Sequence, residues 1–459
     1  MKLAWLFGIL LLAGCVSSPN LQPEMAVPQN WHAVPQNGSG NLADRRWAEI
    51  MPVAELNALI DEALTHNSDL AIAVERIELA RVQYGVDRAA RLPSVRLDVA
   101  ATRQRMPGID PVENQISENG HAGLSLPGWE IDLWGKLRDR AEVSRRDLLA
   151  QEAQAQGVRI SLVAQVATLY LDLLDLDNQI AIAEGTLDGR QRALRLNQRR
   201  FAEGVSSIID VRQAESSLAA AEQAIADQRR RRSQAEHALS VLVGRMPGTI
   251  ARTQSLGALP SPGTLLAGLP ADLLVRRPDI VAAEQALRGT EANISAARKA
   301  YLPSITLTTL LGFASPVLSQ LFESERYAWS VQPGVGLTLF DGGRTGLGVA
   351  RAETQGRILV EQYKATLRQA FREVNDQLVA FEQLELQRQA AARAVAANRG
   401  RLKAANARYL NGVSSYFEVL DAERQLFDSE IGLSQTTRAV HQAVVQLYRA
   451  LGGGWQSDT

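Results

Sequence analysis

The sequence contains few of the residues that build chemical sites. Its 459 residues include one cysteine, five methionines and five histidines. No HExxH motif or paired-ligand spacing joins the histidines, and a lone cysteine forms no intrachain disulfide. We therefore expect no metal site, no cofactor and no enzymatic activity. The scattered histidines are His32, His66, His121, His237 and His441.

Aromatic residues and an excess of one charge are also lacking. Aromatics make up 5% of the chain and the formal net charge is -1. No global field therefore favours a nucleic-acid partner. The four consecutive arginines Arg229 to Arg232 lie among Asp227, Glu222 and Glu236. This mixture indicates a solvated helix face rather than a nucleic-acid patch.

The N-terminus has the layout of a secretory signal. One lysine precedes an apolar run from Leu3 to Ala13, which is too short to span a bilayer. The run ends at Gly14-Cys15 and resembles the bacterial lipoprotein signal, in which the cysteine is acylated, for example by palmitate, and becomes the first mature residue. An ordinary signal with an incidental cysteine is the alternative. Because Val16 rather than Asp follows Cys15, the resemblance implies sorting to the outer membrane.

A stretch of the sequence occurs twice. "RFAEGVSSIIDVRQAESSL" begins at Arg200, and "RYLNGVSSYFEVLDAERQL" begins at Arg408. Such self-similarity indicates an internal duplication. In each copy the glycine suits a left-handed helix cap, and the serines suit the N-cap of a returning helix. The GVSS residues are Gly204, Val205, Ser206 and Ser207 in the first copy and Gly412, Val413, Ser414 and Ser415 in the second.

The periodicity predicts the same elements in both halves of the chain. Alternating apolar and polar residues predict strands at about 93–106, 119–133, 303–315 and 327–341. The phase slips at Pro127-Gly128, where we expect a bulge. We divide the chain into a signal peptide (1–14), an acylated strap (15–50), a first repeat (51–250), a linker (251–270), a second repeat (271–452) and a C-terminal tail (453–459).

Each repeat is expected to contain a long helical hairpin. No proline occurs from Trp134 to Ala202, and apolar residues recur there at steps of four and three, as in a coiled-coil seam. Such a helix is about 100 Å long at about 1.5 Å per residue. Gly185 and Gly189 each cost about 1 kcal/mol relative to alanine, which favours a bend or break there. A second long helix is expected from about Gly343 to Tyr409.

Four strands with one apolar and one polar face cannot close a cylinder alone. In lipid every strand edge must be paired, because unpaired backbone groups find no water there. Three-fold assembly to twelve strands is the simplest closure. The sequence therefore predicts a homotrimer whose helices continue the strands as a second tube.

Several motifs resemble one family. They are "GLPADLLVRRPDI" (Gly268 to Ile280), "AYLPSITL" (Ala300 to Leu307), "LFDGGR" (Leu339 to Arg344) and the doubled GVSS turns. Together they resemble the outer membrane factor family of Gram-negative efflux ducts, in its lipoprotein branch. The resemblance implies a mixed α/β membrane protein, with a trimeric twelve-stranded transmembrane β-barrel and a long periplasmic α-helical barrel. It also implies docking to a periplasmic adaptor and a proton-driven inner-membrane pump.

Acidic residues near the GVSS turns are the candidate functional residues. Asp210, Glu418 and Asp421 lie one or two turns into the returning helices, where acids also favour the helix macrodipole. The resemblance implies a closed periplasmic gate, in which Asp421 matches the constriction acid and Phe417 the bulky residue beside it. Gln213 replaces a second acid in the first copy. We expect three copies of these acids to attract cations, and the GVSS turns to dock the adaptor.

The predicted function is a passive exit duct for small toxic compounds, in the outer membrane and extending into the periplasm. The alternatives are a channel for protein secretion, a duct for heavy-metal efflux and a coiled-coil lipoprotein scaffold without a pore. Fold alone does not separate the first two. The four alternating strands argue against the scaffold, and the five methionines argue against a metal relay.

Overall fold

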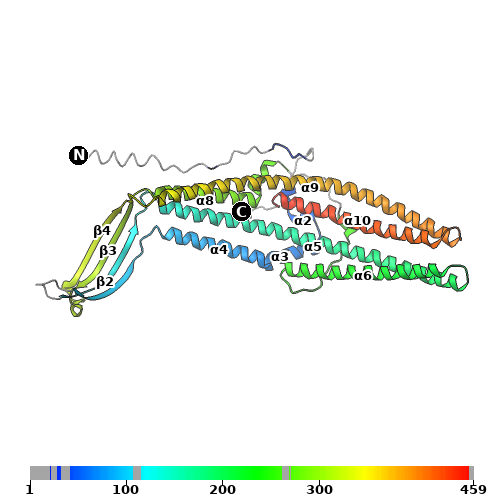
Figure 1. Ribbon diagram of the computed structural model, residues 1–459, viewed down its shortest axis with the longest axis horizontal. Helices are drawn as coiled ribbons and strands as arrows, with labels where there is room; N and C mark the ends of the chain where they lie inside the picture. Colours follow the sequence, from blue (N-terminus) through cyan, green and yellow to red (C-terminus); the bar gives the residue numbers. More distant parts are fainter. Residues whose placement is uncertain are drawn as a thin grey trace. The chain divides into compact units, whose positions relative to one another are not determined.

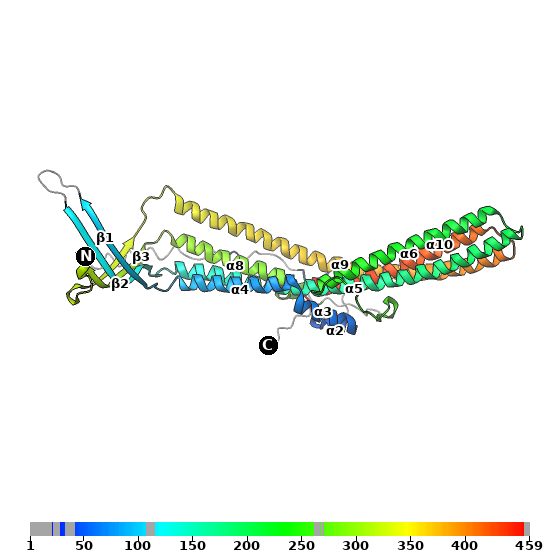
Figure 2. The same cartoon turned by 90° about the horizontal axis from the view of Figure 1, so that it is seen from below.

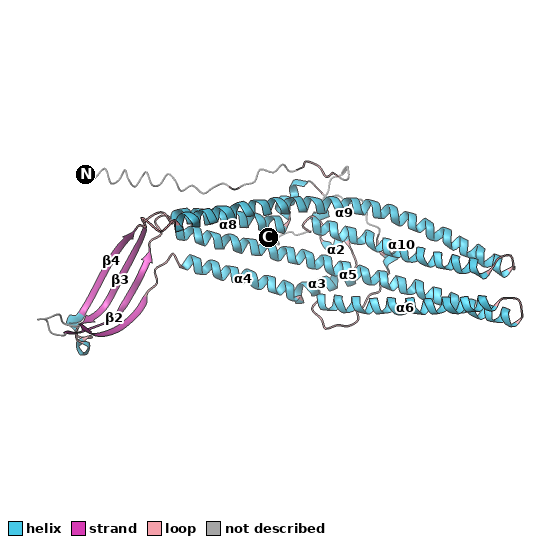
Figure 3. Ribbon diagram, in the orientation of Figure 1, coloured by secondary structure: helices cyan, strands magenta, loops and turns pink. Residues whose placement is uncertain are grey.

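The computed structural model describes residues 21, 28–32, 42–106, 115–260, 268 and 270–453. These residues form mostly helices and one four-stranded sheet (Figure 3). In chain order the elements are η2 (Leu42–Asp44), α2 (Trp47–Ile50), α3 (Ala54–His66), α4 (Ser68–Ala89), β1 (Arg96–Met106), β2 (Gln115–Glu130), α5 (Lys136–Ala202), α6 (Ile208–Leu242), η3 (Leu256–Ala258), η4 (Pro270–Asp272), α7 (Leu273–Arg276), α8 (Pro278–Lys299), β3 (Ser304–Ser315), η5 (Leu318–Gln320), η6 (Ser324–Arg326), β4 (Tyr327–Gly336), α9 (Arg344–Leu410) and α10 (Tyr416–Ala450).

The two halves of the chain contain elements of equal length. Helices α4 and α8 have 22 residues each, α5 and α9 have 67, and α6 and α10 have 35. The chain forms two compact units, and each unit contains parts of both halves. The strands of both halves belong to unit 1, and most of the two helical hairpins belongs to unit 2. Unit 1 comprises Met1–Glu24, Arg76–Glu152 and Ala282–Lys364, and unit 2 comprises Met25–Glu75, Ala153–Val281 and Ala365–Thr459.

The sheet of unit 1 has one apolar and one polar face. Its strands are antiparallel in the order β1-β2-β3-β4, and residues paired across the strands share a face. One row of paired residues is apolar and exposed: Leu97, Leu124, Leu311 and Trp329. The adjacent row, on the opposite face, is polar or small: Asp98, Gly123, Gly312 and Ala328.

Strand β2 contains an irregularity at the Pro127-Gly128 pair, where the sequence predicts a bulge. The pairing register with β3 shifts between Leu126 and Trp129. Gly128 has a φ of 71°, a left-handed conformation that glycine adopts without steric cost. The extra residue returns Trp129 to the face of Leu126.

The last strand is shorter than the sequence suggests. Strand β4 ends at Gly336, whereas the alternation of apolar residues predicts an end near residue 341. Gly336 pairs with Ser304, which is the first residue of β3. The periodicity therefore continues beyond the hydrogen-bonded strand.

Aspartates stabilise both junctions between strand and long helix in unit 1. The Asp132 carboxylate accepts hydrogen bonds from backbone N–H groups at the start of α5, with distances of 3.0 and 2.8 Å. Asp341 accepts bonds of 2.9 and 2.8 Å at the start of α9. Each carboxylate satisfies N–H groups that have no partner within the helix. The buried Lys299 then ties the end of α8 to Asp139 on α5, at 2.5 Å.

Unit 2 consists mainly of two helical hairpins. Helix α6 lies beside α5 and α10 lies beside α9 (Figures 1 and 2). Part of α5 is long and apolar enough to cross a membrane by composition alone. The same helix supplies much of the buried core of this unit, which explains its apolar character. Buried apolar residues recur at three- and four-residue steps along both long helices, namely Leu162, Val166, Leu173 and Ile180 on α5 and Leu367, Val374 and Leu378 on α9.

Of the bend or break expected near Gly185 and Gly189, the break does not occur in α5. Helix α5 continues through both glycines without interruption. Each glycine costs only about 1 kcal/mol relative to alanine. The buried residues Ile180 and Asn197 flank the glycines and are fixed by packing against the rest of unit 2. Packing on both sides therefore outweighs the local preference.

Candidate functional site

The first GVSS turn connects α5 to α6 and is closed by a capping box. Gly204 adopts a φ of 75°, and the Val205 N–H donates to the Arg200 carbonyl at 2.8 Å. The Ser207 hydroxyl accepts a hydrogen bond from the Ile209 N–H at 3.1 Å, and the Asp210 carboxylate accepts from the Ser207 N–H at 3.3 Å. Asp210 therefore stabilises the start of α6, as an acid at a helix N-terminus does.

The second GVSS turn has the same backbone but lacks this cap. Gly412 adopts a φ of 72°, and the Val413 N–H donates to the Arg408 carbonyl at 2.9 Å. Ser415 occupies the N-cap position without a side-chain hydrogen bond to the helix. The Glu418 side chain lies 3.4 Å from the Arg408 guanidinium instead of capping α10. The acid of the second turn therefore pairs with the helix that leads into it.

Both turns expose apolar side chains. Val205 is 62% exposed and Val413 is 66% exposed. Their serines differ, since the Ser206 hydroxyl donates to the Asn197 carbonyl at 3.4 Å. The Ser414 hydroxyl is buried and has no hydrogen-bond partner among the described residues. The two turns therefore expose equivalent valines, but among the described residues the serine hydroxyl that follows each valine is hydrogen-bonded only in the first turn.

Asp421 lies in a network of arginines one turn beyond Glu418. Its carboxylate accepts hydrogen bonds from Arg401 at 2.5 Å and from Arg424 at 3.0 Å. The Arg401 hydrogen bond, followed by the charge of the two arginines, holds the pKa of Asp421 below its ordinary value. Phe417, the neighbour of Glu418, is 65% exposed. In a single chain, Asp421 is therefore a compensated anion rather than a free one.

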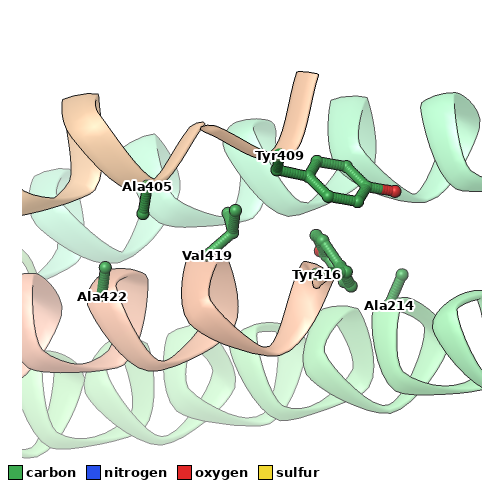
Figure 4. Close-up of a cluster of buried hydrophobic side chains, with 6 residues drawn as sticks. All are labelled: Ala214, Ala405, Tyr409, Tyr416, Val419 and Ala422. Atoms are coloured by element: carbon green, nitrogen blue, oxygen red, sulfur yellow. The ribbon is translucent and has the colours of Figure 1, made fainter. Parts of the chain in front are cut away.

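A buried polar link beneath the turns was not anticipated from the sequence. The Tyr409 hydroxyl on α9 donates to the Asn197 side-chain oxygen on α5 at 2.6 Å, and Asn197 is fully buried. The Tyr409 ring lies 5.4 Å from the Tyr416 ring and 4.9 Å from the Arg200 guanidinium carbon. Figure 4 shows Tyr409 and Tyr416 within an apolar cluster that includes Ala214 of α6. This cluster joins the two hairpins just below their turns.

The only sequence signal for this link is a difference between the copies. Tyr409 aligns with Phe201, so the hydroxyl is present in the second copy alone. A tyrosine in place of phenylalanine at a core position indicates that the hydroxyl has a partner. The identity of that partner required the structure, because Asn197 lies 212 residues away in the sequence.

A second buried network connects α5 to α10 farther from the turns. The fully buried Asp175 accepts hydrogen bonds from Ser434 and from Gln179, the latter at 2.8 Å. The Arg438 guanidinium lies 3.2 Å from Asp175 and 3.1 Å from Asp172. Burial raises the pKa of Asp172, and the charge of Arg438 opposes this rise.

Arg277, within the RRPDI motif, is the hub of a third network. Its guanidinium donates to both oxygens of Asp279 at 3.0 and 2.6 Å, to Glu373 at 2.9 Å and to the Ala450 carbonyl at 2.9 Å. Only 8% of the side chain is exposed. Arg277 therefore fixes the start of α8 to α9 and to the end of α10, which explains why this motif contains an arginine followed by an acid.

Two expectations concern other parts of the chain. Cys15, the predicted lipidation site, lies outside the described residues. Among the residues that the structure describes, no group of three or more His, Cys, Asp or Glu side chains is placed to hold a metal ion.

Comparison with known proteins gives the family. The outer membrane efflux protein family model matches residues 59–245 and 269–453. Outer membrane protein OprJ of Pseudomonas aeruginosa is 35% identical, with 97% of this chain and 94% of that protein covered. Cation efflux system protein CusC of Escherichia coli is 34% identical, with 97% of each chain covered.

Solved structures agree with this assignment. The open-state MtrE outer membrane channel of Neisseria gonorrhoeae has a TM-score of 0.86 and 30% identity, over 96% of this chain and 98% of that one. The resemblance to the outer membrane efflux family that the motifs predict is confirmed. The chain belongs to the outer membrane efflux protein family.

Proposed function

We propose that this protein is the outer-membrane exit duct of a tripartite efflux system. It receives small toxic compounds from a periplasmic adaptor and an inner-membrane pump, and it conducts them passively to the outside. The observation that carries this proposal is the two-faced sheet of unit 1, from which two 67-residue helices continue along the chain.

The sheet supports a trimeric barrel. Among the residues that the structure describes, strands β1 and β4 each have a paired neighbour on one side only, so the sheet has two open edges. In lipid such edges must be paired, and three chains supply twelve strands for a closed cylinder. The face with Leu97 and Trp329 would contact lipid, and the face with Asp98 would line the pore. The equal element lengths of the two halves support a duplicated subunit that gives the helical tube six similar hairpins.

Lipid and partner contacts follow from the same arrangement. We propose that Cys15 carries the acyl chains that anchor the N-terminus in the outer membrane. The exposed valines of the two GVSS turns, Val205 and Val413, form the surface that docks the adaptor. Glu418, Asp421, Asp210 and Phe417 surround the periplasmic gate, with Asp210 acting through the helix cap that it forms. The pump is proton-driven in this proposal.

A metal cation is the second candidate substrate. CusC is a cation efflux system protein by name, and it is 34% identical to this chain. Among the residues that the structure describes, none form a candidate metal cluster, and the whole chain has five methionines. Small organic compounds therefore remain the preferred cargo, with selection made by the pump. Protein secretion has no specific observation in its favour.

The test is assembly and conductance of the purified full-length protein. Mass measurement of the detergent-solubilised complex should give three chains, and planar bilayers containing it should show discrete channels. A stable monomer without conductance would contradict the duct. Deletion of the gene in a strain that also carries its adaptor and pump should lower resistance to organic toxicants. Loss of copper or silver resistance alone would favour the cation alternative.

A further inference from the structure

The loop between β3 and β4, residues 316–326, exposes apolar side chains on an ordered backbone. Leu318 is 53% exposed and Phe322 is 72% exposed. The loop contains the short helical turns η5 and η6, and the Arg326 side chain donates to the Gln320 side chain at 2.8 Å. We call this segment the rim loop. Its apolar residues therefore have defined positions.

The rim loop folds onto the apolar face of the sheet. A Cβ atom on Gly120 of β2 would lie 3.0 Å from the Leu318 Cδ1 atom and 3.8 Å from the Leu321 Cδ2 atom. Gly120 shares its face with Ala122 and Leu124, because side chains alternate along a strand. Leu318 and Leu321 therefore lie over the apolar face. Glycine at position 120 leaves the room for this approach.

An aromatic group continues the same face into the loop. The ring centroid of Phe313 on β3 lies 6.0 Å from that of Phe322 in the loop and 6.3 Å from that of Tyr327 on β4. Phe313 pairs with both Ala122 and Tyr327, so it belongs to the apolar face. Phe322 thus extends the apolar surface of the sheet without a gap.

We propose that the rim loop inserts Leu318 and Phe322 into the hydrocarbon of the outer leaflet and anchors the rim of the barrel there. This inference rests on the proposed transmembrane sheet. The occupant is lipid because the loop surface is continuous with the face proposed to contact lipid. The loop also joins the strands at their ends remote from the helices of unit 1 (Figure 3). Folded this way, the loop does not close the pore on the polar face.

The amphipathic character of the loop fits a membrane interface. Glu323 follows Phe322 directly, Glu325 lies two residues beyond Glu323, and both are exposed. Aromatic residues are enriched where a barrel meets the headgroups, with the ring toward the chains and polar groups toward water. The loop therefore supplies an apolar side for lipid and a charged side for headgroups and solvent.

Site-specific fluorescence tests the inference on the full-length protein in phosphatidylcholine vesicles. Phe322→Cys carries an environment-sensitive fluorophore and is exposed to a nitroxide-labelled phosphatidylcholine or to aqueous iodide. We expect quenching by the lipid nitroxide and loss of iodide quenching. Glu323→Cys, one residue farther along the loop, is the matched control. For it we expect quenching by iodide and no quenching by the lipid nitroxide. The unsubstituted protein, whose only cysteine is Cys15, gives the background.

Two reporters on the sheet separate this inference from the proposed function. Val331→Cys lies on the apolar face and Gln332→Cys on the other. If Val331→Cys is quenched by lipid and Phe322→Cys by iodide, the loop faces water and only the anchoring is overturned. If neither is quenched by lipid, the transmembrane sheet fails as well. Protection of Phe322→Cys from both quenchers would mean burial against protein and would also overturn the anchoring. Leu318→Cys repeats the measurement should Phe322→Cys disturb the loop.

Discussion

Removal of the Tyr409 hydroxyl should loosen the junction between the two hairpins. Tyr409→Phe keeps the ring, its packing against Tyr416 and its contact with Arg200. It removes the 2.6 Å hydrogen bond to Asn197 and leaves the amide oxygen of a fully buried side chain without that donor. A buried acceptor that loses its hydrogen-bond donor lowers the free energy of unfolding by about 1–3 kcal/mol. The substitution should therefore destabilise the region beneath the turns.

The expected size of the effect follows from this free energy. A loss of about 1–3 kcal/mol raises the population of the locally open state about 5- to 150-fold, since about 1.4 kcal/mol corresponds to a factor of ten. Hydrogen exchange measured by mass spectrometry reports this opening for peptides at the C-terminal ends of α5 and α9 and at the N-terminal end of α10. Exchange should accelerate there and remain unchanged in peptides from the sheet.

Tyr416→Phe is the matched control. Tyr416 is 2% exposed, and its hydroxyl has no hydrogen-bond partner among the described residues. Its removal should leave exchange unchanged or slow it, because no bond is lost and an unsatisfied polar atom disappears. Equal acceleration by Tyr409→Phe and Tyr416→Phe would refute the reasoning. No acceleration by Tyr409→Phe would refute it too.

Three further predictions concern the other networks. Arg277→Ala should lower the free energy of unfolding by about 3 kcal/mol, since it leaves the partly buried Glu373 and the Ala450 carbonyl without the buried guanidinium, whereas Arg276→Ala, at a side chain that is 35% exposed, should lower it by at most about 1 kcal/mol, both read from thermal unfolding in detergent. Ser207→Ala should lower the free energy of unfolding by about 1 kcal/mol and accelerate hydrogen exchange at the start of α6. Ser415→Ala removes no cap hydrogen bond and should change neither the stability nor the exchange at the start of α10. In single-channel recordings Arg401→Ala should increase cation preference and Asp421→Ala should decrease it. Arg401 lowers the pKa of Asp421, so Asp421 loses its negative charge only when the pH falls through that lowered pKa. The cation preference should therefore be unchanged from about pH 8 to about pH 5. A change within that window would contradict the pairing of Asp421 with Arg401.

The features predicted correctly from sequence are those that depend on short-range pattern. Alternation along the strands predicted the two faces of the sheet, because successive side chains point in opposite directions. Gly204 and Gly412 indicated left-handed caps, since few other residues adopt that conformation without cost. Ser206 or Ser207 indicated the start of α6, and the structure has Ser207 as the N-cap. Each of these inferences needs only a few consecutive residues.

The features that the sequence did not reveal depend on which distant residues meet. Asn197 and Tyr409 lie on different helices, and no local pattern pairs them. The end of β4 at Gly336 coincides with its pairing to Ser304, the first residue of β3, rather than with the end of its own alternation. Gly185 suggested a break that packing overrides. In each case a tertiary contact decides between local alternatives of similar energy.

Tertiary contacts also change the net charge expected at the proposed gate. From sequence, three copies of Glu418 and Asp421 suggest six repelling carboxylates. The structure places Glu418 beside Arg408, and Asp421 beside Arg401 and Arg424, within one chain. Two carboxylates and three guanidiniums sum to +1 per chain instead of -2 for the acids alone. These pairs are solvent-accessible and screened by water, so they can exchange partners readily. If these acids line the aperture as proposed, closing it requires no protonation, because each carboxylate already has a guanidinium partner within its own chain.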